Sequence, residues 1–176
     1  MTVSPLLPIS PVFSRWWGRH TGSRMAWRTV PWQTGPGSAF KVRFMVALDT
    51  NVLVRLLNGD DTEQVARAVV LIDTHDCWVS HTVLLELAWI LQRPLGVPKA
   101  EAIGALDAVL RLRTISTPHR DAVLAALDRA RRGMDIADAI HLMVAETAGA
   151  ASLATFDRRF VRQAAVTNSH VSVIEP

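Results

Sequence analysis

The chain has 176 residues, 49% of them hydrophobic, which is enough for one domain with a sizeable core. Its formal net charge is +3. Residues 1–44, however, carry six basic residues and no acid, and residues 45–176 carry 13 basic and all 16 acidic residues, a net charge of −3. The basic total therefore gives no reason to class the domain as a nucleic-acid binder.

No run reaches the roughly 18 apolar residues that a transmembrane helix needs. Cys77 is the only cysteine, which excludes an internal disulfide and favours a reduced thiol in the cytoplasm.

Residues 1–44 form a basic leader rich in proline and tryptophan, without helical or alternating periodicity. A targeting segment is one interpretation, but prolines interrupt its apolar part, "SPLLPISPVF", which makes a poor signal-peptide core. A nucleic-acid-binding arm is a second. We favour a third interpretation, a disordered or non-native extension, with the domain spanning residues 45–176.

From residue 45 onward, short apolar strands alternate with helices. Strands are predicted at residues 46–49, 77–80, 113–116, 151–154 and 171–174, and helices at 51–57, 61–73, 81–92, 98–110, 117–131 and 135–147. Asp61 and Thr117 are the expected N-caps of two of these helices. The alternation predicts an α/β fold with a parallel sheet covered by helices, in which ligands bind at the carboxyl ends of the strands.

Asp49 and Asp157 each follow a predicted strand, at the edge where such a sheet places its chemistry. Asp49 also suits a helix N-cap, and Asp157 also suits a turn acid paired with Arg158 or Arg159. Position alone leaves both interpretations open for each acid.

Glu86 lies in "VLLELAWIL", which is apolar at every other position. A helix that is apolar all round is buried all round, so we expect Glu86 to be buried. A bare buried carboxylate costs several kcal/mol and therefore requires a partner. That partner is a metal cation or a shared acidic site, or else a distant arginine.

Asp138 lies in "MDIADAIHLMVA", on the helix face opposite to Ile136, Ile140 and Met143. Periodicity alone fits a solvated helix face as well as a functional site. Asp135, three residues earlier, is interpreted mainly as a helix cap.

Four acids are thus expected to converge on one edge of the sheet. Clustered carboxylates raise one another's pKa unless a cation neutralises them. Oxygen ligands select Mg²⁺ or Mn²⁺, and such an ion activates water and stabilises charge on a phosphodiester. The residues therefore predict phosphodiester hydrolysis.

Four blocks, in this order and spacing, resemble a PIN domain, and within that superfamily a VapC-type toxin of a type II (VapBC) toxin–antitoxin system. The blocks are "VALDTNVLVRLL", "VLLELAWIL", "DIADAIHLMVA" and "LATFDRRF". The resemblance covers residues 45–176 and none of the leader. It implies an α/β/α sandwich with a central parallel sheet and an Mg²⁺- or Mn²⁺-dependent endoribonuclease that cleaves tRNA, rRNA or mRNA. It also implies a cognate antitoxin, a homodimer and a cytoplasmic protein that does not bind membranes.

Carried over position by position, the resemblance makes four acids both catalytic and metal-binding: Asp49, Glu86, Asp138 and Asp157. Asp49 and Asp138 are expected to hold the metal, and Glu86 and Asp157 to complete the cluster partly through water.

Three further residues are expected to orient ligands or water around those acids. Asn51 matches the polar position two residues after the first acid, and Thr155 matches the hydroxyl before the last. Asp135 is the third.

Two alternatives were weighed against the nuclease. A haloacid-dehalogenase-type phosphatase also begins with a strand ending in Asp, but it needs a second Asp where this chain has Asn51. A non-catalytic PIN-like module that binds RNA or a partner is the other.

His141 has no His or Cys partner at zinc spacing and is interpreted as structural or groove-lining. Eight arginines have two interpretations, either as contacts to phosphate groups or as solvated surface charges. They are Arg111, Arg113, Arg129, Arg131, Arg132, Arg158, Arg159 and Arg162.

Overall fold

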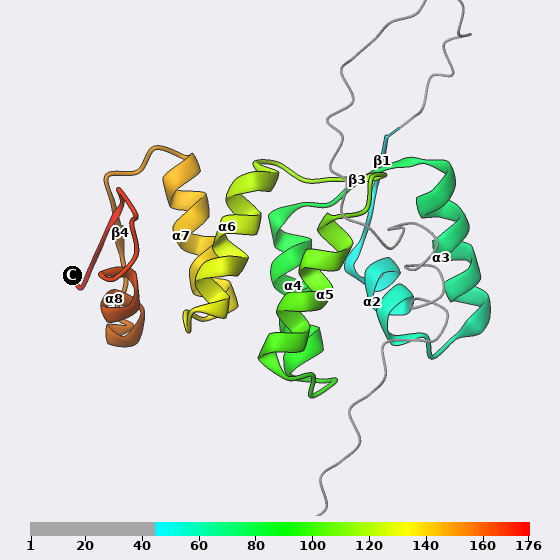
Figure 1. Cartoon of the computed structure of the whole chain (residues 1–176), viewed down its shortest axis with the longest axis horizontal. Helices are drawn as coiled ribbons and strands as arrows, with labels where there is room; N and C mark the ends of the chain where they lie inside the picture. The colour runs from blue at the N-terminus through cyan, green and yellow to red at the C-terminus, as the bar shows by residue number, and fades with distance from the viewer. Residues whose placement is uncertain (1–44) are drawn as a thin grey trace, which may run out of the picture.

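The computed structural model describes residues 45–176, and the predicted leader, residues 1–44, lies outside this part of the chain. The elements follow in the order β1 (Met45–Ala47), α2 (Thr50–Asn58), α3 (Thr62–Thr74), β2 (Asp76–Trp78), α4 (His81–Gln92), α5 (Lys99–Leu110), β3 (Ile115–Ser116), α6 (Arg120–Arg131), α7 (Ile136–Thr147), β4 (Ser152–Ala154), α8 (Arg158–Ala164) and β5 (Ser172–Ile174). Strands and helices alternate as predicted (Figure 1), which confirms the α/β class. No helix in the described residues is long and apolar enough to cross a bilayer.

Every strand pair is parallel, as predicted. β2 lies between β1 and β3, with Val46 opposite Cys77 and Cys77 opposite Ile115. β4 pairs with β5, with Leu153 opposite Val173. The described strands are divided between two sheets, β1-β2-β3 and β4-β5.

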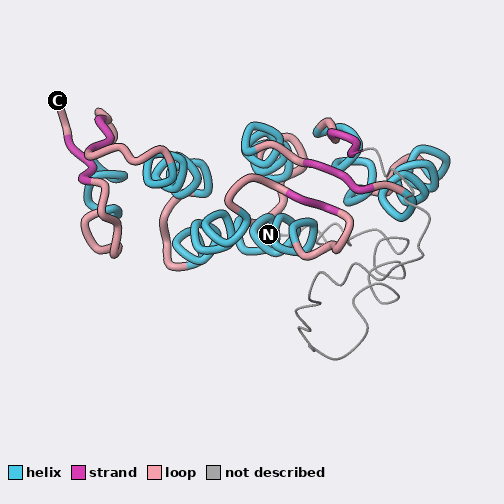
Figure 2. Tube along the Cα trace, turned by 90° about the horizontal axis from the view of Figure 1, so that it is seen from above, coloured by secondary structure: helices cyan, strands magenta, loops and turns pink. Residues whose placement is uncertain are grey.

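Helices α4 to α7 lie between the two sheets in Figure 1, with β4 at the C-terminal end of the molecule and β1 on the other side. The view from above in Figure 2 also keeps the C-terminal strands apart from the rest. α7 packs along α6 and against α4. Buried alanines on both α6 and α7, including Ala126, Ala130 and Ala139, are small enough to let these two helices approach closely.

Local signals placed most helix ends correctly. Asp61 caps α3 by accepting a hydrogen bond from the Gln64 amide, as predicted. The predicted start of α6 at Thr117 is wrong: the helix begins at Arg120, after His119 in a left-handed conformation with φ 49°. Sequence analysis also missed α8, a helix of only seven residues.

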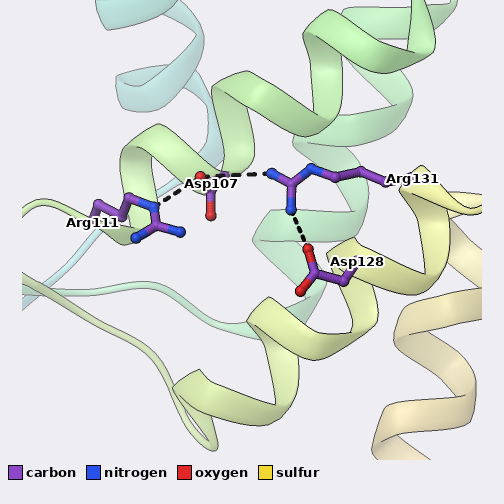
Figure 3. A network of polar contacts seen from close by, with 4 residues as sticks. All are labelled: Asp107, Arg111, Asp128 and Arg131. Atoms are coloured by element: carbon purple, nitrogen blue, oxygen red, sulfur yellow. Dashed lines mark hydrogen bonds and ion pairs between the residues drawn. The ribbon is translucent and has the colours of Figure 1, made fainter.

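An ion-pair network joins α5 to α6 (Figure 3). Arg131 on α6 lies between two acids, with its Nη1 2.5 Å from Asp128 Oδ1 and its Nη2 3.6 Å from Asp107 Oδ2. Asp107 also accepts a 2.8 Å hydrogen bond from Nε of Arg111, the residue that directly follows α5. These two arginines are therefore already paired with acids of the protein itself.

Candidate active site

Asp49 follows β1 and occupies the N-cap position of α2, yet its side chain makes no capping hydrogen bond. Its Oδ2 instead accepts a 3.0 Å hydrogen bond from Nδ2 of Asn51, and both side chains are exposed. The N-cap interpretation therefore explains where the backbone of Asp49 lies but gives its carboxylate no function. That carboxylate is accessible to a ligand.

Glu86 on α4 is bound from α2. The hydroxyl of Thr50, which is only 2% exposed, donates a 2.5 Å hydrogen bond to Oε2 of Glu86. Because Thr50 directly follows Asp49, this bond holds Glu86 near the carboxyl end of β1. Sequence analysis missed the role of Thr50, although a threonine between Asp49 and Asn51 was the available signal.

The expectation that Glu86 is buried is wrong. Glu86 is exposed, and Trp89, one turn further along α4, is 59% exposed. The described helices in close contact with α4 are α2, α5 and α7, and they leave the face that carries these two residues open. Glu86 therefore needs no buried counter-ion, and its carboxylate faces solvent.

Asp138 lies in the first turn of α7 and is half-buried. Burial raises the pKa of its carboxyl group, and the nearby charges of Asp135 and Asp157 raise that pKa further. His141 and Arg159 act in the opposite direction without cancelling the rise. Because Asp138 is half-buried, its carboxyl does not lie on a fully solvated helix face.

The two acids beside Asp138 are helix caps. Asp135 accepts a 2.8 Å hydrogen bond at Oδ1 from the Ala137 amide, which confirms the predicted capping role. Asp157 accepts hydrogen bonds of 2.7 Å and 3.2 Å at Oδ1 from the amides of Arg159 and Phe160, in the first turn of α8. The Asp157 amide in turn donates a 3.1 Å bond to the Thr155 hydroxyl. No described residue bonds Oδ2 of either acid, so each keeps one oxygen for a ligand.

The four predicted acids thus fall into two groups. Asp49 and Glu86 lie beside the end of β1, whereas Asp138 and Asp157 lie where α7 and the end of β4 meet. In residues 45–176, no set of three or more His, Cys, Asp or Glu side chains is close enough to hold a metal ion. β1, which precedes Asp49, and β4, which precedes Asp157, belong to different sheets, so strand pairing does not bring these two acids to one sheet edge.

The chemistry of these donors nevertheless suits a hard divalent cation. All four residues offer carboxylate oxygens, the ligands that Mg²⁺ and Mn²⁺ prefer. None of the four forms a salt bridge with a described basic side chain. Each group therefore supplies two carboxylates and a negative charge that no described side chain neutralises at contact distance.

Of the eight candidate arginines, four are engaged in ion pairs: Arg111, Arg129, Arg131 and Arg158. The other four are exposed and form no salt bridge within the described residues: Arg113, Arg132, Arg159 and Arg162. Among these, Arg159 is close enough to Asp138 to lower its pKa. His141, also exposed, lies one turn after Asp138.

Residues 46–166, more than half of the chain, match the family described as PIN domain. The matched region runs from β1 to just beyond α8 and contains all four acids. A comparison with curated proteins gives no match.

Proposed function

Because the chain belongs to the PIN domain family, a family with a nuclease-type fold that typically binds a divalent metal, we propose that it is an Mg²⁺- or Mn²⁺-dependent endoribonuclease. We propose further that it acts as the VapC-type toxin of a toxin–antitoxin pair. The observation that carries the proposal is the state of the four acids: Asp49, Glu86 and Asp157 are exposed, Asp138 is half-buried, and none of the four forms a salt bridge with a described residue.

The local structure supports a separate role for each group of acids. Asn51 and Thr50 fix the side chains of Asp49 and Glu86, so that these carboxylates are oriented before a ligand binds. Around Asp138, the partial burial and the neighbouring acids disfavour the charged carboxylate in the metal-free protein. A cation is therefore expected to bind where it relieves this repulsion. When bound, Mg²⁺ or Mn²⁺ stabilises charge on the phosphodiester and activates water.

The phosphate backbone of an RNA substrate is negatively charged, so its binding beside these acids requires a positively charged side chain. Arg159 fits this role because it is exposed, lies near Asp138 and forms no salt bridge with a described residue. We assign it to binding phosphate groups of the RNA, where each basic contact adds a salt-dependent contribution to affinity.

The test is cleavage of total bacterial RNA by the purified full chain in Mg²⁺ or Mn²⁺. Discrete fragments that disappear with EDTA and with Asp49→Asn are the expected result, and their ends identify the RNA that is cut. Intact RNA in the presence of folded protein that binds Mn²⁺ would overturn the nuclease proposal.

The toxin role has its own test. Induced expression in a bacterial host should arrest growth, with Asp49→Asn as the inactive control, and co-expression of the cognate antitoxin should restore growth. Cleavage in vitro without any growth arrest would keep the nuclease and reject the toxin.

One observation favours a second candidate, a PIN-like module that binds RNA or a partner without cutting. It is that the described residues bring no three metal-ligating side chains together. RNA binding that survives EDTA, with no cleavage under any metal condition, would support this module.

A further inference from the structure

A cavity of about 650 Å³ lies where the C-terminal half of α6 meets α8 and the turn that follows it. None of the four candidate acids lines this cavity. Its walls combine apolar side chains, including Met134 and Val166, with a few polar ones. This size and this mixture are typical of sites that bind a small organic group.

The charged side chains of the cavity leave one positive charge uncompensated. Arg129 donates hydrogen bonds of 2.8 Å and 2.7 Å to Glu146, and Asp128 is paired with Arg131 at 2.5 Å (Figure 3). Arg132, in contrast, is exposed and forms no salt bridge with any residue between 45 and 176. The cavity therefore favours a ligand that carries a negative charge.

The amide of Gln163, on the α8 side of the cavity, lacks a hydrogen-bond donor. Its Nε2 donates a 3.0 Å hydrogen bond to the carbonyl of Gly133. A carbonyl can only accept, so this bond fixes the orientation of the amide and leaves Oε1 as the free acceptor. Oε1 is buried and has no partner among the described residues. Because Oε1 is shielded from water, a ligand that packs against this side chain can supply the missing N–H group.

Helix α8 connects the cavity to the candidate active site. The Arg159 amide donates a 2.7 Å hydrogen bond to Asp157, and Gln163 follows one helical turn after Arg159. Arg159 and Arg162 are neighbours on the helix surface, and both are exposed without a salt bridge to a described residue. Unpaired positive charges therefore lead from Asp157 along α8 to the cavity.

We propose that this cavity binds one nucleotide of an RNA strand whose neighbouring segment lies at the acids. Arg132 contacts the phosphate group of that nucleotide, and Gln163 accepts a hydrogen bond from an amino group on its base. Arg159 and Arg162 contact the phosphate groups between the cavity and the acids. The inference rests on the proposed function only in taking RNA as the ligand.

A nucleotide fits these features better than an acidic peptide does. The cavity adds an enclosed, partly apolar space to the free arginines, and a base can fill such a space. The row of arginines also begins beside Asp157, one of the acids to which phosphodiester cleavage is assigned.

The first test measures the salt dependence of RNA binding in EDTA, so that no cleavage occurs. The full chain is titrated against a fluorescent oligocytidylate at several salt concentrations. Arg132→Gln should reduce the slope of log affinity against log salt by about 0.7, the value for one phosphate contact on a single strand. Arg113→Gln is the matched control, because Arg113 is equally exposed and unpaired in the described chain but precedes β3. Equal slopes for wild type and Arg132→Gln overturn the proposal.

The second test isolates the amino group of the base. Cytosine carries an amino group where uracil carries a carbonyl, so the two bases compare a donor with an acceptor in the same shape. The wild-type protein should bind oligocytidylate about 2- to 10-fold more tightly than oligouridylate, as expected for one hydrogen bond. Gln163→Leu should remove this preference and leave the salt slope unchanged. The proposed contact fails if the wild type shows no preference, or if a folded leucine variant keeps it.

The third test separates an RNA strand from a free nucleotide and from a peptide. Arg162→Gln should lower the salt slope for the oligomer and leave the affinity for cytidine monophosphate unchanged. An oligomer that binds no more tightly than the monophosphate, with no effect of Arg162→Gln, would mean that the ligand is a free nucleotide. Displacement of the oligomer by polyglutamate, with the same dependence on Arg132 and Gln163, would mean an acidic peptide. Either result overturns the proposal.

These measurements do not depend on cleavage. Cleavage by the wild type together with unchanged binding by Arg132→Gln and Gln163→Leu would reject the cavity and keep the nuclease. The expected binding effects without any cleavage would reject the nuclease and keep the cavity.

Discussion

The hydroxyl of Thr50 and the carboxylate of Glu86 are joined by a 2.5 Å hydrogen bond between residues 36 positions apart. The donor is buried in α2 and the acceptor is exposed on α4. One buried threonine thus fixes the direction of an acid that has no other hydrogen-bond partner in the described chain. The bond orients Glu86 more than it stabilises the fold, since solvent can hydrate the carboxylate if the hydroxyl is removed.

Thr50→Val should separate those two effects. The free energy of unfolding should change by less than about 1.5 kcal/mol, because the lost hydrogen bond is only partly buried. Cleavage or Mn²⁺ affinity should fall about 10- to 100-fold, as is usual when the partner of a metal ligand is lost. Urea denaturation and RNA cleavage measure the two quantities, and Thr50→Ser should retain both. Equal activity in the valine and serine variants would mean that Glu86 needs no orientation.

Asp49→Asn should abolish metal binding and leave stability within about 0.5 kcal/mol, since Asn is as good an N-cap residue as Asp. Asp61→Ala is the matched control because Asp61 does cap α3, through a 3.0 Å bond from the Gln64 amide. That variant should lose about 1 kcal/mol of stability and keep its Mn²⁺ affinity. Thermal melts and calorimetric titration with Mn²⁺ measure both. The assignment of Asp49 fails if its variant behaves like that of Asp61.

Asp138→Asn should raise the melting temperature of the metal-free protein at pH 7. The pKa of Asp138 is raised in the folded state, by burial first and then by Asp135 and Asp157, so its charged form destabilises the fold above that pKa. The difference should vanish as the pH falls below the normal value of 3.8, where the carboxyl is protonated in both states. Added Mn²⁺ should stabilise wild type and not the variant. A variant that is still stabilised by Mn²⁺ would remove Asp138 from the metal site.

Glu146→Gln should cost about 1–3 kcal/mol at pH 7 because Glu146 accepts two hydrogen bonds from Arg129, of 2.8 Å and 2.7 Å, at a site that is mostly buried. Burial alone would raise the pKa of Glu146, but hydrogen bonds from Arg129 and Ser169 outweigh it and lower the pKa below 4.5. The stabilisation is therefore fully present above pH 4.5 and is lost as the pH falls through the lowered pKa.

Urea denaturation at neutral and acidic pH measures this loss. Asp128→Asn serves as the exposed control, since the Asp128 side chain is 56% exposed in its pair with Arg131, and it should cost no more than about 1 kcal/mol. Equal costs for the two variants would contradict the difference in burial.

Local features of the fold could be predicted from the sequence because their causes are local. Asp61 and Asp135 cap helices through bonds to residues two or three positions away, and both were identified correctly. The candidate acids were likewise found because each stands out against apolar neighbours or follows a strand.

Features that depend on distant contacts could not be predicted. The exposure of Glu86 depends on which helices pack against α4, and the apolar stretch around it contains no such information. The division into two sheets depends on which strands meet, and parallel strands of similar composition do not specify their neighbours. The start of α6 was misplaced because Thr117 and Pro118 carry an N-cap signal, whereas the left-handed His119 is the actual boundary.

The rate at which a thiol reagent labels the buried Cys77 measures how often the sheet around it opens. Cys77 is fully enclosed in β2, the central strand of its sheet, so a thiol reagent can reach it only when that sheet separates. At high reagent concentration the labelling rate equals the rate of that opening. A ligand that binds beside the end of β1, the strand paired with β2, should slow the labelling of Cys77 without contacting the thiol.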